Sequence, residues 1–162
     1  MKAVQITTLD GPSALEVKDL PRPVPGDDQV LIRVRAAGVA FPEVLQSRGL
    51  YQLKPELPFT PGAEIAGDII NAPDGSGFAP GDRVASLCLL GGFAEEAVAH
   101  LDTTFKLPDT VSYEQGASLI FNYGTAYFAL VERGQLQAGE SVLVQGAAGG
   151  VGTAAIQVAK AF

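Results

Sequence analysis

The sequence predicts an α+β fold, in which a β-barrel domain is followed by the first strand, turn and helix of a doubly wound α/β domain. Two observations predict this fold. As far as Leu107, short apolar runs alternate with turns rich in Pro and Gly, which is the spacing of strands in a barrel or sandwich. After Pro108 the apolar period becomes helical, and residues 141–145 form a short apolar strand that leads into a glycine-rich turn. We therefore expect one domain at residues 1–124 and the beginning of a second at residues 125–162.

Several apolar runs in the first part of the chain are expected to be strands. They occupy residues 2–6, 15–20, 29–39, 63–72, 82–90 and 93–99. In the third run, Val30, Ile32 and Val34 alternate with neighbours that include Arg33 and Arg35. Alternation with a period of two allows one face of the strand to be buried while the arginines occupy the other face.

Helix signals interrupt and follow these strands. A short helix is expected at residues 42–48, where a proline occupies the first turn and a glycine follows the last. Residues 112–115 have the spacing of a capping box, which predicts a helix that runs on to Ile120. Thr125 is expected to cap a further helix that ends before Gly134.

The composition indicates a folded chain and excludes several classes of partner. Apolar residues make up 47% and charged residues 18%, so disorder is not expected. The net charge of -7 and the lack of a basic run disfavour nucleic acid. No apolar run approaches the roughly 20 residues that span a bilayer, and residues 1–12 lack the pattern of a signal peptide, so no membrane association is expected. The single cysteine, Cys88, excludes an internal disulfide and indicates a reducing compartment, so a cytoplasmic location is expected.

The glycine-rich turn predicts a dinucleotide site. It follows the apolar run 141–145 directly and precedes a helix in which Val151, Ala155, Val158 and Phe162 share one face. A pyrophosphate must sit on unpaired N–H groups at the helix N-terminus, and large side chains in the turn would hold it away. The residues expected to bind the cofactor here are Gly146, Ala148, Gly149, Gly150, Val151 and Gly152.

Seven segments in a fixed order carry a resemblance that covers the whole chain. They are GVAFPEVLQSRGLY (38–51), LPFTPGAEIAGDI (57–69), GDRVA (81–85), GGFAEEAVA (91–99), LPDTVSYEQGASL (107–119), NYGTAYFAL (122–130) and GESVLVQGAAGGVGTAAIQVAKAF (139–162). This set resembles the medium-chain dehydrogenase/reductase superfamily and, within it, the zinc-free quinone oxidoreductases related to zeta-crystallin. The resemblance implies a GroES-like β-barrel catalytic domain followed by the truncated beginning of a Rossmann domain.

The departures from zinc-dependent relatives imply chemistry without a metal. Those relatives have a cysteine where this chain has Ala40, a histidine where it has Ala63, and a lobe of four cysteines after the position of Val84. Tetrahedral zinc needs about four N or S ligands, which one cysteine and one histidine cannot supply. No metal is therefore expected. The resemblance implies hydride transfer from NADPH to a quinone or a similar electron-poor acceptor, which needs no Lewis acid because the acceptor delocalises the charge.

The same resemblance assigns site residues. It places Phe41, Asn122 and Thr125 near the nicotinamide half of the cofactor, and Tyr51 and Glu64 among the candidate catalytic residues. Tyr51 is either a proton donor or a residue packed on the barrel with its hydroxyl in water. Glu64 is either part of the floor of the site or a salt-bridged structural acid.

Several alternatives stay open from the sequence. On the same scaffold, an enoyl thioester or enone reductase would reduce a C=C bond, and a non-enzymatic GroES-like module would bind only a partner. No ribose-reading residue and no further parallel strands are present, so we expect a whole protein about twice as long, and little activity of these residues alone. A homodimer is expected for the whole protein.

Overall fold

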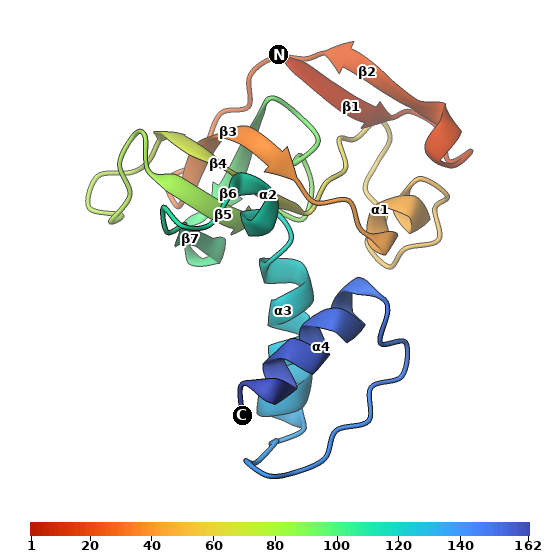
Figure 1. Cartoon of the computed structure of the whole chain (residues 1–162). Helices are drawn as coiled ribbons and strands as arrows, with labels where there is room; N and C mark the ends of the chain where they lie inside the picture. The colour runs from red at the N-terminus through yellow and green to blue at the C-terminus, as the bar shows by residue number, and fades with distance from the viewer. The chain divides into compact units, whose positions relative to one another are not determined.

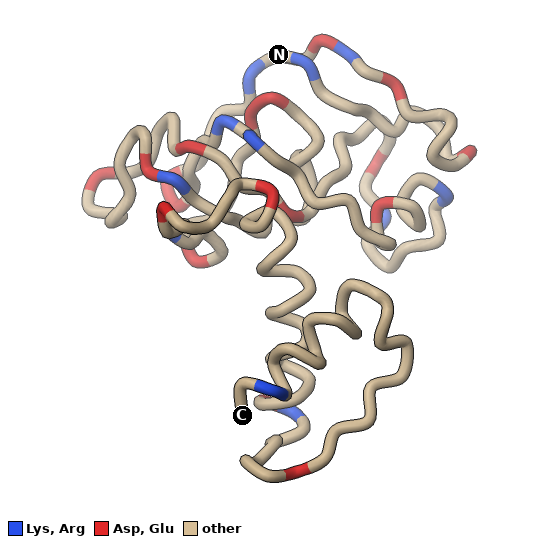
Figure 2. Tube along the Cα trace, in the orientation of Figure 1, with Lys and Arg blue, Asp and Glu red and all other residues tan.

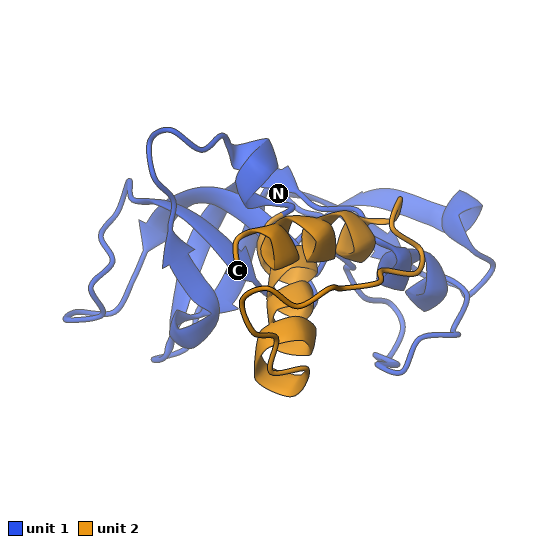
Figure 3. Ribbon diagram, turned by 60° about the horizontal axis from the view of Figure 1, so that its bottom comes forward, with its two compact units in different colours: residues 1–118 blue, residues 119–162 orange.

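The structure, a computed structural model, describes residues 1–162 and confirms the predicted α+β fold. The chain divides into two compact units, Met1–Ser118 and Leu119–Phe162 (Figure 3). The first unit contains the strands β1 (Lys2–Ile6), β2 (Leu15–Asp19), β3 (Gln29–Ala37), β4 (Glu64–Asn71), β5 (Arg83–Leu87), β6 (Glu96–His100) and β7 (Thr104–Lys106). Its helical segments are η1 (Pro12–Ala14), α1 (Phe41–Gln46), η2 (Leu101–Thr103) and α2 (Tyr113–Gly116). The second unit contains α3 (Ile120–Tyr127), the π-helix η3 (Phe128–Arg133) and α4 (Gly150–Lys160).

The first unit is built on antiparallel sheets. A five-stranded sheet with the order β6-β3-β4-β5-β7 curls into a half-barrel, and β1 and β2 pair as a separate hairpin (Figure 1). The hairpin joins the rest of the unit through bridges from Ala3 to Ala94 and from Ile6 to Phe59. The six runs expected as strands all form strands, and β7 is a further short one.

The core of this unit lies on one face of the five-stranded sheet. Val30 and Ile32 of β3 are fully buried while Arg33 and Arg35 are exposed, as the alternation predicts. Leu31 is also buried, at 5% exposure, so both faces of this part of β3 are covered. The other members of the core cluster are Ile65, Ile69, Val84, Ala97 and Ala99. Burial of such aliphatic side chains is the main stabilising contribution of the sheet.

Charged residues are distributed unevenly between the two units. Figure 2 shows that most Lys, Arg, Asp and Glu positions belong to the first unit, where acidic and basic residues are interspersed along the chain.

A helix that crosses a bilayer needs about 20 apolar residues. No helix of this chain has the length and apolar character for that.

Two helices differ from the boundaries expected from the sequence. The capping box is present, with Ser112 Oγ accepting from Gln115 N at 3.2 Å, but α2 ends at Gly116 instead of continuing to Ile120. The hydroxyl of Ser118, two residues after the end of α2, lies 3.1 and 3.0 Å from the carbonyls of Glu114 and Gln115 and donates to them.

Thr125 does not cap a helix, which contradicts the sequence prediction. Helix α3 begins at Ile120, and Thr125 lies inside it with its hydroxyl donating to the carbonyl of Phe121 at 2.6 Å. This bond to the carbonyl four residues earlier is the usual way in which a threonine is accommodated within a helix. The apolar residues before Thr125 therefore continue the helix instead of preceding it. The end at Gly134 is confirmed.

The prediction of a strand at residues 141–145 is also wrong, because these residues form no strand in the structure. A strand of a parallel sheet is held by hydrogen bonds to neighbouring strands, and the second unit contains no strand to supply them. Leu143 is 88% exposed, while Val144 packs against the small core of this unit. The turn and the helix that follow are formed as expected.

Small residues hold α3 and α4 together. Ala126 of α3 and Ala154 and Ala155 of α4 are buried, with Val158 partly buried beside them. Two residues of the apolar face expected for α4 lie outside this core, since Val151 is 39% and Phe162 is 48% exposed. The contact therefore uses the small side chains of α4, which allow the two helices to approach closely.

The β3–β4 pair requires a glycine at position 67. The register shifts between Val34 and Ala36, and there the backbone of β3 approaches Gly67 so closely that an added Cβ would lie 2.0 Å from the carbonyl oxygen of Arg33. We expect Gly67→Ala to lower the free energy of unfolding by about 1–3 kcal/mol or more, because backbone must move to relieve the clash. Chemical denaturation followed by circular dichroism measures this change.

The matched control is Gly124→Ala, because Gly124 lies within a helix with nothing within 4 Å of its added Cβ. Alanine is the better helix former, so this variant should be neutral or more stable by roughly 0.5–1 kcal/mol. Equal stability of the Gly67→Ala protein and the wild type would contradict the requirement for glycine.

Candidate functional site

In the first unit, the predicted site residues Phe41 and Glu64 are connected through the side chain of Glu43. Phe41 is the first residue of α1 and Glu64 is the first residue of β4. The N–H of Ala40 donates to Oε2 of Glu43 at 2.9 Å, and the N–H of Ala63 donates to Oε1 of the same carboxylate at 3.2 Å. Glu43 is only 6% exposed. One buried carboxylate therefore binds the residue before each of these two positions.

Glu43 is not among the site residues predicted from the sequence. One local signal for it exists, because Glu43 stands three residues after Ala40, the spacing at which a glutamate reaches back to the N-cap N–H. An alanine in place of the usual Ser or Thr hides this signal. The bond to Ala63 joins residues 20 positions apart, and no local pattern indicates it.

Glu64 lies beside Gly38, where two segments of backbone approach closely. The N–H of Gly38 donates to the carbonyl of Glu64 at 2.9 Å, next to the antiparallel pair of Ala37 and Ile65. A Cβ added at Gly38 would lie 2.3 Å from the carbonyl oxygen of Ala117 and 3.4 Å from Oε2 of Glu64. Glu64 itself is 5% exposed. Only glycine fits beside this carboxylate.

The thiol of Cys88 lies in the same region. Its Sγ donates to the carbonyls of Gly62 and Ala63, at 3.4 and 3.5 Å. Burial raises the pKa of the Cys88 thiol to about 12, and the negative charges of Glu43 and Glu64 add to this increase. The thiol is therefore protonated at neutral pH and cannot act as a nucleophile, which agrees with its expected role as a small apolar residue.

Tyr51 lies in the loop that follows α1. The N–H of Leu50 donates to the carbonyl of Leu45 at 2.9 Å, which anchors the beginning of this loop to the helix. Tyr51 is half-buried, and its phenol makes no hydrogen bond within the chain. Leu50, the residue before Tyr51, is 68% exposed, and Phe41, at the beginning of α1, is 70% exposed. The first unit thus presents a phenol with free hydrogen-bonding capacity in an apolar setting.

In the second unit, the glycine-rich turn leads into α4 without a side-chain cap. The N–H of Gly149 donates to the carbonyl of Gly146 at 3.0 Å, and Gly146 has a φ of 69° that favours glycine. A Cβ added at Gly152 would lie 2.3 Å from the same carbonyl oxygen, so the turn folds directly onto the helix. The N–H groups of Gly150, Val151 and Gly152 donate to no acceptor in this turn, so at the helix N-terminus they are available to a hydrogen-bond acceptor.

Asn122 lies against this turn. A Cβ added at Gly150 would lie 2.9 and 3.0 Å from Oδ1 and Nδ2 of the Asn122 amide. The pairing of α3 with α4 is fixed by Tyr123, whose hydroxyl donates to Oε1 of Gln157 at 2.7 Å. The structure thus brings Asn122 together with Gly150 of the predicted turn, whereas Gly146 and Ala148 of the same turn are exposed. Thr125, in contrast, is exposed and directs its hydroxyl to its own helix.

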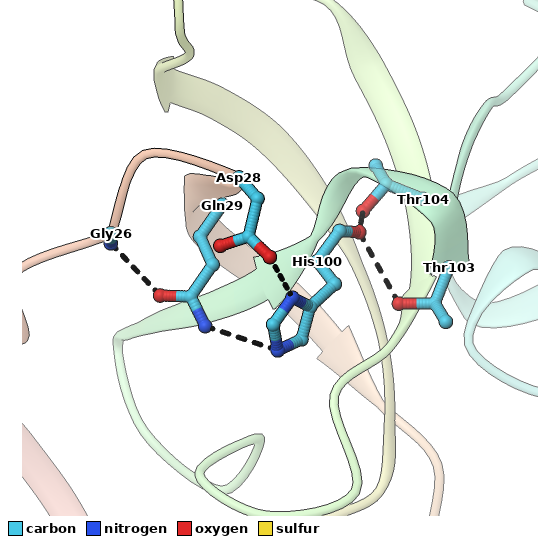
Figure 4. A network of polar contacts seen from close by, with 6 residues as sticks. All are labelled: Gly26, Asp28, Gln29, His100, Thr103 and Thr104. Atoms are coloured by element: carbon cyan, nitrogen blue, oxygen red, sulfur yellow. Dashed lines mark hydrogen bonds and ion pairs between the residues drawn. The ribbon is translucent and has the colours of Figure 1, made fainter.

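The single histidine belongs to a separate surface network, shown in Figure 4. Nδ1 of His100 lies 3.1 Å from Oδ2 of Asp28, and Nε2 lies 3.2 Å from Nε2 of Gln29. The Gln29 carbonyl accepts from the N–H of Gly26 at 2.9 Å, which directs its amide nitrogen toward the imidazole. This network joins the beginning of β3 to the end of β6.

The side chains of the first unit do not offer a metal-binding set. Positions 40 and 63, which hold zinc ligands in zinc-dependent relatives, carry alanine and present their N–H groups to Glu43. Across the chain, no group of three or more His, Cys, Asp or Glu side chains is arranged to hold a metal ion.

We expect the Cys88 thiol to react slowly with thiol reagents. A pKa of about 12 instead of 9.0 leaves on the order of a thousand times less thiolate at pH 8 than in a free cysteine. Labelling with dithionitrobenzoate should be slow in the native chain and fast after unfolding in urea. Equally fast labelling in both states would contradict the protected thiol.

Comparisons with known proteins show which family this chain resembles. The family model of the alcohol dehydrogenase GroES-like domain matches residues 26–109. Human quinone oxidoreductase is 46% identical over 165 residues, which cover 100% of this chain and 50% of that protein. The chain therefore spans about half the length of the curated relatives that it matches.

Two solved structures have closely similar folds. One is a probable oxidoreductase from Mycobacterium abscessus, with a TM-score of 0.93 and 49% identity over 99% of this chain and 52% of that one. The other is the quinone oxidoreductase from Thermus thermophilus, which was also determined in complex with NADPH. It has a TM-score of 0.86 and 40% identity, and the match covers 99% of this chain and 50% of that one.

Proposed function

The chain belongs to the family of alcohol dehydrogenase GroES-like domains, and we propose that the whole protein transfers a hydride from NADPH to a quinone or a similar electron-poor acceptor without a metal. The observation that carries this proposal is the uncapped turn at α4. Its free N–H groups, its small residues and the adjacent Asn122 fit a pyrophosphate and its neighbouring ribose. The names of the relatives, quinone oxidoreductases that include one solved with NADPH, support the choice of cofactor and acceptor.

The second unit would hold the cofactor. The N–H groups of Gly150, Val151 and Gly152 would bind the pyrophosphate, and Gly146, Ala148 and Gly149 would shape the turn around it. Asn122 would bond to the nicotinamide half, together with Thr125, whose hydroxyl oxygen keeps lone pairs free to accept while it donates to Phe121. When bound, NADPH supplies the hydride.

The first unit would hold the acceptor. Phe41 offers an exposed apolar surface to an aromatic ring, the Tyr51 phenol can donate a proton to an oxygen of the reduced product, and Glu64 would lie at the floor of the site. At the positions of the zinc ligands, Ala40 and Ala63 leave no side chain to bind a Lewis acid. A quinone suits this site because it delocalises the incoming charge into its own ring, so the protein needs only to align it.

NADPH binding and quinone reduction by the full-length protein test this function. We expect 1,4-benzoquinone to oxidise NADPH in its presence, as followed by loss of absorbance at the nicotinamide band. Gly150→Ala should weaken NADPH binding by about tenfold, because the methyl group would displace the Asn122 amide and narrow the turn. Gly124→Ala, with open space around its added Cβ, is the control. A wild-type protein that binds no NADPH would favour the alternative of a non-enzymatic binding module.

A second candidate function is the reduction of an enone or enoyl thioester, which the unpartnered phenol of Tyr51 favours. Such a product needs a proton at carbon, whereas a hydroquinone anion can take its proton from water. We expect Tyr51→Phe to lower activity on an enoyl thioester by about a hundredfold if this reaction is native, and to leave quinone reduction within about twofold. Equal loss on both substrates would show that Tyr51 does not distinguish the two reactions.

A cytoplasmic location and a homodimer stay predictions. Both follow from the sequence and the resemblance, and size-exclusion chromatography with light scattering measures the second directly.

A further inference from the structure

The buried carboxylate of Glu43 carries an inference that rests on the proposed function. Both of its oxygens accept backbone N–H groups, at 2.9 Å from Ala40 and 3.2 Å from Ala63, and no Lys, Arg or His forms an ion pair with it. The carboxylate is therefore held by backbone hydrogen bonds and not by an ion pair. A buried charge without a cation is costly, and an apolar residue would hold a helix on a strand at lower cost. The carboxylate instead provides two directional bonds.

Those two bonds hold the residues that directly precede two of the proposed site residues. Ala40 directly precedes Phe41, and Ala63 directly precedes Glu64, so each bond fixes the backbone from which a proposed site residue projects. No helix or strand lies between α1 and β4. The carboxylate thus joins the beginning of the helix to the beginning of the strand across a connection that has no regular structure to hold it.

We propose that Glu43 is a positioning residue of the proposed reductase, which fixes the wall at Phe41 relative to the floor at Glu64. It touches neither the acceptor nor the cofactor and acts through these two residues. The thiol of Cys88 supports the arrangement, because the negative charges of both Glu43 and Glu64 act on it, which places the two carboxylates close to one group. Correct alignment of acceptor and hydride donor is the main contribution that a protein makes to this type of transfer.

Two substitutions separate this role from simple helix capping. Glu43→Gln has nearly the same shape but presents an amide N–H₂ group to one of the two backbone donors, so it can satisfy only one of them. Glu43→Asp keeps the charge and the local bond to Ala40, but it is one methylene shorter and cannot also reach Ala63. The control is Glu95→Gln, because Glu95 is exposed and accepts a single backbone N–H, from Lys2 at 2.8 Å.

Amide exchange measured by NMR on this 162-residue chain tests the connection itself. The N–H of Ala63 should exchange about tenfold faster or more in both Glu43 variants than in the wild type, while the N–H of Ala40 stays protected in Glu43→Asp. Unchanged exchange at Ala63 in both variants would overturn the proposal.

Kinetics of the full-length protein test the positioning role. We expect kcat for quinone reduction to fall by about tenfold to a hundredfold in both Glu43 variants, with KM changed much less, because the acceptor binds but is misaligned. The Kd for NADPH and the secondary structure should match the wild type, and Glu95→Gln should keep full activity. An active wild type with equally active Glu43 variants would overturn the inference, whereas an inactive wild type would overturn the proposed function instead.

Discussion

The pairing of β3 with β4 is the interaction on which the rest of the first unit depends. Its register places Ala37 opposite Ile65, so the end of one strand lies beside the beginning of the other. The chain that leaves β3 enters α1 within a few residues, and the chain that enters β4 begins at Glu64. Antiparallel pairing thus brings α1 and Glu64 together although a long loop separates them in sequence. The bonds made by Gly38 and by Glu43 then fix this proximity.

The same pairing explains what could be predicted from the sequence. Strand alternation is a local property, and Val30, Ile32 and the two arginines of β3 are correctly assigned by it. The bond from Ala63 to Glu43 depends on how two distant segments meet, and nothing in the local sequence specifies it. The close approach at Gly67 likewise follows from a register shift that appears only when the strands are paired.

The sequence predictions that are wrong in the second unit fail for a different physical reason. Residues 141–145 have the composition of a buried strand, but a strand is defined by its neighbours, and this unit has none. The turn and α4 form without them, since a helix satisfies its own backbone and the Gly146 turn closes by a bond to Gly149. Thr125 shows the limit of residue preference, because α3 already begins at Ile120 and Thr125 lies inside the helix, although threonine is favoured at a cap.

Two buried carboxylates of the first unit also act on its single thiol. Glu43 and Glu64 are both buried, and together with burial they hold the Cys88 thiol in its neutral form. The same charges oppose formation of a thiolate at Cys88. Hydride transfer to a simple carbonyl would place a full charge on one oxygen, which a zinc ion would have to offset. In the proposed reaction a quinone would distribute the charge over its ring and both oxygens, so the protein would need no metal to offset it.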